Sequence, residues 1–94
     1  MVRKITYTKH ALLRMERRNI DAKDVERVLF GEHETFVNTM HDVFIAVRRD
    51  PPLVIVYRLH GREEIRVITV FSPKNINRLV ERRTSKGRWQ QWLE

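Results

Sequence analysis

The sequence predicts an α+β domain made of two N-terminal helices, a four-stranded antiparallel sheet and a C-terminal helix. Helix caps and apolar residues at helical spacing fill the N-terminal third, whereas β-branched and aromatic residues dominate residues 34–71. The breaks between the strand-like segments are too short for crossover helices, so the strands should form antiparallel hairpins. We expect all the helices on one side of this sheet, in a single domain of residues 1–94 with a basic helix and tail from about residue 73.

The chain should begin with a short strand and a capped helix. Residues 5–7, Ile-Thr-Tyr, favour a strand, and Thr8 is suited to cap a helix that runs from Lys9 to about Arg18. Asn19 suits the left-handed backbone conformation that commonly follows a helix end.

A second helix is expected between Asp21 and Gly31. Asp21 can cap it, and Asp24 in its first turn interacts favourably with the helix dipole. Gly31 should end it. Its apolar stripe, at positions i, i+3 and i+4, consists of Val25, Val28 and Leu29.

Four strands are expected in the middle of the chain, separated by Asp, Pro and Gly residues. Two nearly continuous apolar runs, residues 53–56 and 67–70, are typical of central strands that are covered on both faces. The expected strands are residues 34–38, 42–49, 53–59 and 63–71.

A third helix should follow the last strand, with Ser72 as its N-cap and Pro73 as its first residue. The end of the chain, residues 88–93, is amphipathic and should dock on the domain. We favour packing of Trp89 and Trp92 against the chain's own sheet or a second copy over stacking on bases. The apolar stripe of the third helix consists of Ile76, Leu79 and Val80.

The charge balance indicates a polyanionic partner. The chain has 19 Lys and Arg against 12 Asp and Glu, which gives a net charge of +7 and a pI of about 10.6. The excess lies at the two ends, because residues 1–20 carry +5 and residues 73–94 carry +4, whereas residues 21–72 carry −2. RNA or an acidic protein is therefore the expected partner.

What the sequence lacks excludes other classes of protein. Without Cys there is no disulfide, thiol chemistry or Cys-ligated zinc. The four His residues show no metal-ligand spacing and there is no Gly-rich phosphate loop, so we expect no metal and no cofactor. No apolar run approaches the roughly 18 residues that cross a bilayer, and none follows the N-terminus as in a signal peptide. We expect a cytoplasmic protein that does not contact membranes.

The helix of residues 9–18 carries the strongest candidate site. At about 100° per residue, His10, Arg14 and Arg18 follow one another along one side of it. Arg17 lies beside His10. Arginine forks bind phosphate oxygens, and an imidazole can transfer protons near neutral pH. These groups suffice for metal-independent RNA cleavage, in which a 2′-hydroxyl attacks the neighbouring phosphorus, but they also fit a solvated basic face.

The same segment resembles a known pattern, His-x-x-x-Arg-Met-x-x-Arg-x-Ile, of a small domain family of unknown function placed near the RelE and BrnT type toxins. The resemblance covers residues 9–72 at best and implies a RelE/BrnT-like ribonuclease-toxin fold with an acidic antitoxin as partner. Asn19 stands where that family commonly has Gly, a difference that a left-handed cap tolerates. RelE-like enzymes often use a C-terminal aromatic or basic residue near the cut phosphate, but no Tyr follows Tyr57 here, so a ribosome-dependent RelE mechanism does not carry over. The matching residues are His10, Arg14, Met15, Arg18, Ile20, Asp24, Val25, Val28, Leu29 and, more weakly, the strand of residues 65–71.

Arginines of the strands and of the last helix are further candidates. Arg66 and Thr69 have opposite parity on one strand, so we expect them on opposite faces of the sheet. Arg66 should border a cleft or pair with Glu64 or Asp42. Tyr57 should fill the core. The remaining phosphate-binding candidates are Arg48 and Arg58 on neighbouring strands, and Arg78 and Arg82 on the C-terminal helix.

Taken together, these features predict a toxin-like, metal-independent endoribonuclease, the toxin of a type II toxin–antitoxin pair. His10 would transfer protons, with Arg14 and Arg18 acting on the phosphate. Two alternatives remain open, a non-catalytic nucleic-acid-binding module and a protein-interaction domain or homodimer that uses the Trp-bearing tail. The substrate-binding residues would be Arg17, Arg66, Arg78 and Arg82.

Overall fold

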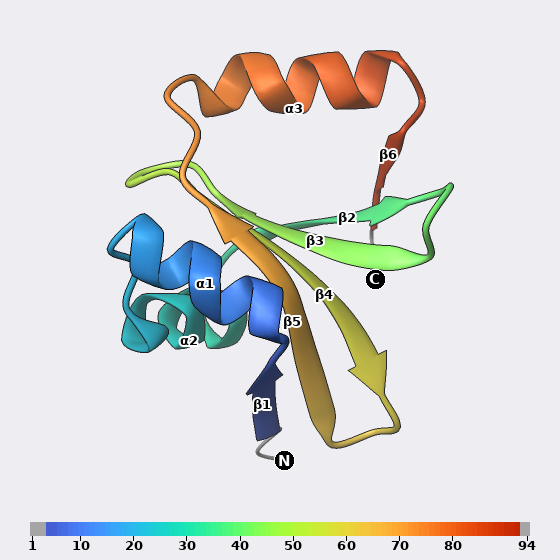
Figure 1. The fold of residues 1–94 in the computed structure, drawn as a ribbon. Coiled ribbons are helices and arrows are strands. Elements are labelled where there is room, and N and C mark those ends of the chain that lie inside the picture. The colour runs from blue at the N-terminus through green and yellow to red at the C-terminus, as the bar shows by residue number, and fades with distance from the viewer. Residues whose placement is uncertain (1–3, 93–94) are drawn as a thin grey trace.

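The computed structural model describes residues 4–92, which form three helices and one six-stranded sheet (Figure 1). The α+β class is therefore confirmed. The strands lie in the order β1-β5-β4-β3-β2-β6; β1 runs parallel to β5, and every other neighbouring pair is antiparallel. The elements are β1 (Lys4–Tyr7), α1 (Lys9–Arg17), α2 (Ala22–Phe30), β2 (Glu34–Asn38), β3 (Val43–Arg48), β4 (Leu53–His60), β5 (Glu64–Phe71), α3 (Ile76–Ser85) and β6 (Trp89–Gln91).

The predicted four-stranded sheet is only the middle of the observed one. Its strands β2 to β5 form the expected hairpins, but β1 and β6 extend the sheet at its two edges. Backbone hydrogen bonds fix both additions: Thr8 N donates to Val67 O at 2.9 Å, and Trp92 N donates to Thr35 O at 2.8 Å. The C-terminal segment thus docks as predicted, but as a strand.

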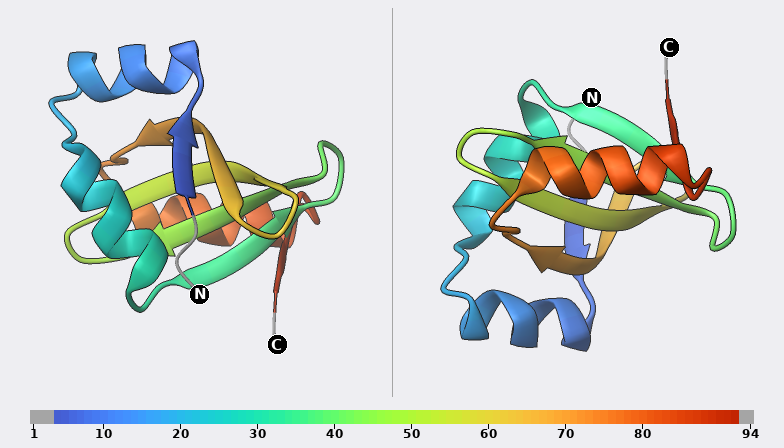
Figure 2. Two further views of the ribbon diagram at one scale, coloured as in Figure 1. Left: turned by 90° about the horizontal axis from the view of Figure 1, so that it is seen from below. Right: turned by 90° about the horizontal axis from the view of Figure 1, so that it is seen from above.

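The prediction that all the helices share one side of the sheet is wrong. Figure 2 shows α3 across the strands in the view from above, and behind them in the view from below. The reason lies in β4, whose apolar residues alternate between two cores. Leu53 and Ile55 pack with α1 and α2, whereas Val54 packs with α3, so both faces need a helical cover.

The ends of α1 and α2 agree with the sequence. The hydroxyl of Thr8 accepts a hydrogen bond from Ala11 N at 3.1 Å, and Asp21 accepts one from Lys23 N at 3.0 Å. Asn19 follows α1 with φ of 55°, the expected left-handed conformation. The Ser72-Pro73 cap of the third helix is wrong.

The third helix begins at Ile76, later than predicted, because the chain must first pass from the end of β5 to the face of the sheet that α3 covers. Asn75 caps α3 and accepts a hydrogen bond from Arg78 N at 3.1 Å. Ser72 is used elsewhere, since its hydroxyl donates to Pro52 O at 2.7 Å.

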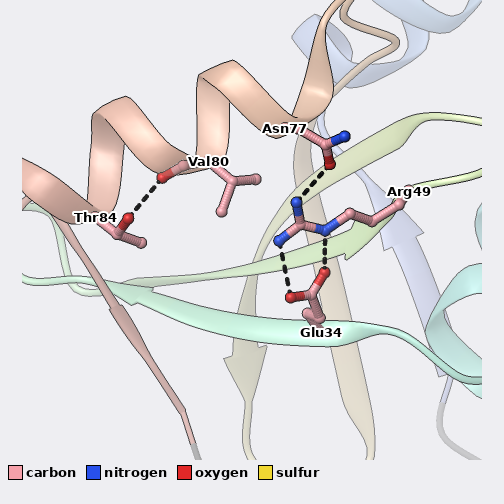
Figure 3. A network of polar contacts seen from close by, with 5 residues as sticks. All are labelled: Glu34, Arg49, Asn77, Val80 and Thr84. Carbon is pink, nitrogen blue, oxygen red and sulfur yellow. Dashed lines mark hydrogen bonds and ion pairs between the residues drawn. The ribbon is translucent and has the colours of Figure 1, made fainter.

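A three-residue polar network ties α3 to the sheet (Figure 3). Arg49 donates from Nε and Nη2 to the two carboxylate oxygens of Glu34 at 2.6 and 3.0 Å. Its Nη1 donates to Asn77 Oδ1 at 2.6 Å. The hydrogen bond to Glu34 raises the pKa of the Arg49 guanidinium.

Candidate functional site

The two basic ends of the chain lie on opposite faces of the sheet. Residues of α1 belong to the core that also contains α2, whereas α3 covers the second core (Figures 1 and 2). The structure therefore does not bring His10 together with Arg78 and Arg82. The predicted substrate-binding set divides between the two faces.

His10 and Arg14 lie along one side of α1, as the helical spacing predicts. Ala11 and Met15 are buried, and the residues directly before them, His10 and Arg14, lie one above the other on the same side. Arg18 is the C-cap and lies eight residues after His10, about 12 Å farther along the helix axis. Arg18 therefore lies about two helical turns beyond His10.

A groove of about 550 Å³ opens on the α3 face where α3 no longer covers the sheet. Half-buried Val56 and Ile68 lie in its floor. We call it the sheet groove, and its lining residues are Thr8, Asn38, His41, Val43, Val56, Arg58, His60, Arg66 and Ile68.

Two arginines stand side by side in the sheet groove. Arg58 on β4 and Arg66 on β5 are direct cross-strand partners, so their side chains leave the same face. Arg58 donates from Nη2 to the backbone oxygen of His41 at 3.2 Å. Arg66 donates from Nη2 to Glu64 Oε2 at 3.1 Å, one of the two pairings predicted for it. Both guanidinium groups are exposed and keep further donors for a ligand.

A β-bulge overturns the expected parity of β5. Val56 pairs with Thr69, but Tyr57 pairs with Val67, so one extra residue lies in β5. Because Val56 and Arg58 share a face, their partners Thr69 and Arg66 share it too. Simple alternation had placed these two residues on opposite faces.

Arg48 does not flank this surface. It pairs with Leu53, which belongs to the α1/α2 core, and its Nε donates to Pro51 O at 3.0 Å. Arg48 and Arg58 therefore lie on opposite faces. Tyr57 is buried and stacks on Phe44 with ring centroids 5.6 Å apart, as expected of a core residue.

Two imidazoles complete the sheet groove. His60 is the last residue of β4, and His41 lies in the turn between β2 and β3. The sequence analysis did not single out either histidine as a site residue. The available signal was the register of the strands, because continuing the β3–β4 ladder from the Phe44–Tyr57 pair places position 41 opposite position 60.

Glu64 lies beside the sheet groove through its ion pair with Arg66. Thr6 Oγ1 donates to its Oε2 at 2.9 Å, and this hydrogen bond, followed by the charges of Arg66 and His60, lowers the pKa of the Glu64 carboxyl. Glu64 thus stays ionised and orients Arg66.

The start of α1 is fixed to the rim of the sheet groove. Thr8 Oγ1 donates to Ile68 O at 3.0 Å, and both residues line the groove. His10 follows Thr8 by two residues in the first turn of α1, but the described residues that line the groove do not include His10.

Comparison with protein-family models supplies one match. Residues 7–72 match the family described as Domain of unknown function (DUF4258). The chain belongs to the DUF4258 family. The match includes α1 and the groove arginines of this DUF4258 domain and ends before α3. Searches of curated proteins and of solved structures each found no match to the chain.

The cations of α3 lie outside the DUF4258 match but on the same face as the sheet groove. Arg78 and Arg82 line a smaller hollow of about 220 Å³ near the start of α3. Arg83 lies over the ring of Trp89 at 5.8 Å from its centroid.

The tryptophans of the tail have different environments. Trp89 is buried against Phe36, with ring centroids 5.6 Å apart, so it packs on the chain's own sheet as predicted. Trp92 is 51% exposed, and its ring contacts the ring of Phe44 edge-on on the α1/α2 face of the sheet. Leu93 lies outside the described residues.

Two searches within residues 4–92 gave negative results. This part of the chain contains no group of three or more His, Asp or Glu side chains that could hold a metal ion. No helix in it is both long and apolar enough to span a bilayer.

Proposed function

We propose that the protein binds RNA in the sheet groove and cleaves it without a metal ion. The observation that carries this proposal is the cross-strand pair of Arg58 and Arg66 in a groove that also contains two imidazoles. Phosphate binding and proton transfer are the two requirements of this reaction, and these four side chains supply both.

The pairing of the two arginines itself favours an anionic ligand. Like charges directly opposite each other in a sheet destabilise it, by roughly 0.2–1 kcal/mol. Glu64 compensates only one of them. A phosphodiester offers two charged oxygens to two guanidinium groups, and the apolar floor of Val56 and Ile68 suits a sugar or base.

The flank of α1 begins at the rim of the sheet groove and continues on the opposite face of the sheet. His10 lies close in sequence to Thr8 on the groove rim, and Arg14 and Arg18 follow it along the helix. The residue types and spacing of this helix suggest proton transfer for His10 and phosphate contacts for Arg14 and Arg18. Because α1 leads away from Thr8, Arg17 and Arg18 would contact other phosphates of the same RNA than Arg66 does.

The same resemblance implies the cellular role, the toxin of a type II toxin–antitoxin pair in the cytoplasm. The net charge of +7 supports an acidic antitoxin, which would inhibit by covering the sheet groove. Induced expression should arrest growth, and substitution of Arg58 and Arg66 together should abolish the arrest.

The direct test is a cleavage assay on a mixed-sequence single-stranded RNA in the presence of EDTA. The wild-type protein should produce shorter fragments, and Arg58→Ala/Arg66→Ala should not. Arg48→Ala is the matched control, because it removes one strand arginine from the other face. Equal cleavage by all three proteins would remove the sheet groove from the reaction.

Non-catalytic nucleic-acid binding is the second candidate. It is favoured by the position of Arg78 and Arg82 on the same face as the sheet groove, which gives an RNA strand a longer basic path. This candidate predicts salt-dependent binding to RNA without new fragments, and losses of affinity spread over many Lys and Arg substitutions.

A further inference from the structure

We propose that His41 and His60 form the acid–base pair of the sheet groove. This inference rests on the proposed RNA cleavage and replaces His10 as the proton-transfer group. It names two residues that the sequence pattern did not single out.

The position of the two histidines supports this assignment. Both line the sheet groove with Arg58 and Arg66, whereas the described residues lining it do not include His10. The backbone oxygen of His41 accepts the hydrogen bond from Arg58 Nη2, which fixes the β2–β3 turn next to β4. His60 shares a face with Arg58, two residues before it on the same strand. The two imidazoles thus flank the place where the arginines would hold a phosphate.

Transfer of two protons balances the reaction. One imidazole, neutral at the start, accepts the proton of the ribose 2′-hydroxyl while that oxygen forms a bond to phosphorus. The bond from phosphorus to the 5′-oxygen breaks, and the second imidazole, protonated at the start, donates its proton to that oxygen. The products are a 2′,3′-cyclic phosphate and a 5′-hydroxyl, and Arg58 and Arg66 bind the extra charge on the phosphate in the transition state.

A reaction that needs one neutral and one protonated imidazole should have a maximum rate at an intermediate pH. The charged groups next to the two histidines are Lys4 on β1, Asp42 before β3, Arg58 on β4, Arg62 and Glu63 in the β4–β5 turn, and Glu64 and Arg66 on β5.

Four single variants test the assignment: His41→Gln, His60→Gln, His10→Gln and His33→Gln. His33 is the matched control, because it is also a turn histidine but lies at the opposite end of β2 from the sheet groove. All four are compared on a fluorescent mixed-sequence RNA with EDTA present, and binding is measured on the same RNA carrying 2′-O-methyl groups, which cannot supply the nucleophile. Circular dichroism melting checks that each variant folds.

We expect His41→Gln and His60→Gln each to slow cleavage on the order of 100-fold while binding changes less than about twofold. Each should lose one limb of the pH profile, and His33→Gln should cleave like the wild type. If His41→Gln or His60→Gln cleaves at the wild-type rate, or if His10→Gln abolishes cleavage, the assignment of the acid–base pair is overturned. The proposed function would still stand. A wild-type protein that binds the methylated RNA but does not cleave the unmethylated RNA would overturn both the acid–base pair and the proposed cleavage.

Discussion

Arg58 and Arg66 are direct neighbours across the β4–β5 pair, and both guanidinium groups lie in the open part of the α3 face. Neighbouring strands usually avoid like charges at such positions. This pair lies beside two imidazoles and over an apolar floor, and the proposed function gives it a phosphate to bind.

Arg58→Thr should therefore separate stability from binding. Thr favours β-strands, and its substitution removes the like-charge contact at the loss of a single exposed hydrogen bond to His41. We expect an unfolding free energy equal to that of the wild type or up to about 0.5 kcal/mol higher. Affinity for single-stranded RNA should fall, and the negative slope of log K against log salt should become shallower by about 0.7. Urea unfolding and a salt titration of fluorescence anisotropy measure the two effects. A less stable protein that binds RNA normally would contradict the role of Arg58.

Distance along α1 leads to a second prediction. Arg18 lies about 12 Å along the helix axis from His10. Its removal should therefore change how the binding affinity depends on RNA length more than it changes phosphate binding in the sheet groove. Arg18→Ala should weaken binding to a long RNA several-fold but leave binding to a dinucleotide unchanged, whereas Arg66→Ala should weaken both. Isothermal titration with the two ligands makes the comparison. Equal losses on the dinucleotide would place both arginines at one phosphate.

The sequence predicts most local structure of this chain because caps and apolar stripes act over a few residues. Thr8, Asp21 and Asn19 take the conformations their side chains favour. The face of the sheet that α3 covers was mispredicted, since nothing local specifies on which side a helix returns after Phe71. The need for a helix on each face follows only from the alternation of Val54 and Ile55 between the two cores.

The candidate site was harder to predict because its residues come from four strands and from two of the segments between elements. The helical spacing of His10 and Arg14 is visible in one segment, whereas Arg58, Arg66 and His60 come together only through strand register. The bulge in β5 adds a second obstacle, since it changes which side chains share a face after Val67.

The two tryptophans of the tail should differ strongly in their contribution to stability. Trp89 is 5% exposed, stacks near Phe36 and lies under Arg83, so Trp89→Ala should cost about 3–5 kcal/mol. Trp92 is half exposed, and Trp92→Ala should cost no more than about 1–2 kcal/mol. Chemical unfolding of both variants gives the comparison. Analytical ultracentrifugation tests a homodimer through Trp92, which would dissociate in Trp92→Ala.

The contact between Arg49 and Glu34 should stabilise α3 by a small, measurable amount. Both side chains are more than a third exposed, which limits the pair to about 0.5–1 kcal/mol even with two-point geometry. A double-mutant cycle with Arg49→Met and Glu34→Gln should give a coupling energy in that range, reduced by high salt. Asn77→Ala, which removes only the third hydrogen bond, should cost less than either charge substitution. A coupling energy of zero would show that the packing of Ile76 and Val80 holds α3 alone.

Glu64 should make the stability of the fold sensitive to acid. Its pKa in the folded chain is lowered below the usual value of 4.5, chiefly by the hydrogen bond from Thr6. An acid with a lowered folded-state pKa stabilises the fold fully above its unfolded-state pKa, and this stabilisation is lost as the pH falls through the folded-state pKa. Between about pH 5 and pH 3 the melting temperature of Glu64→Gln should therefore fall less steeply than that of the wild type. Thr6→Val should flatten the curve in the same direction, because it removes the main cause of the lowered pKa. Glu63→Gln removes a neighbouring carboxylate in the turn and leaves the Thr6 hydrogen bond in place, so it is the control and should leave the wild-type slope unchanged. If Glu63→Gln and Glu64→Gln flatten the curve equally, net charge rather than the Thr6 hydrogen bond governs the acid response.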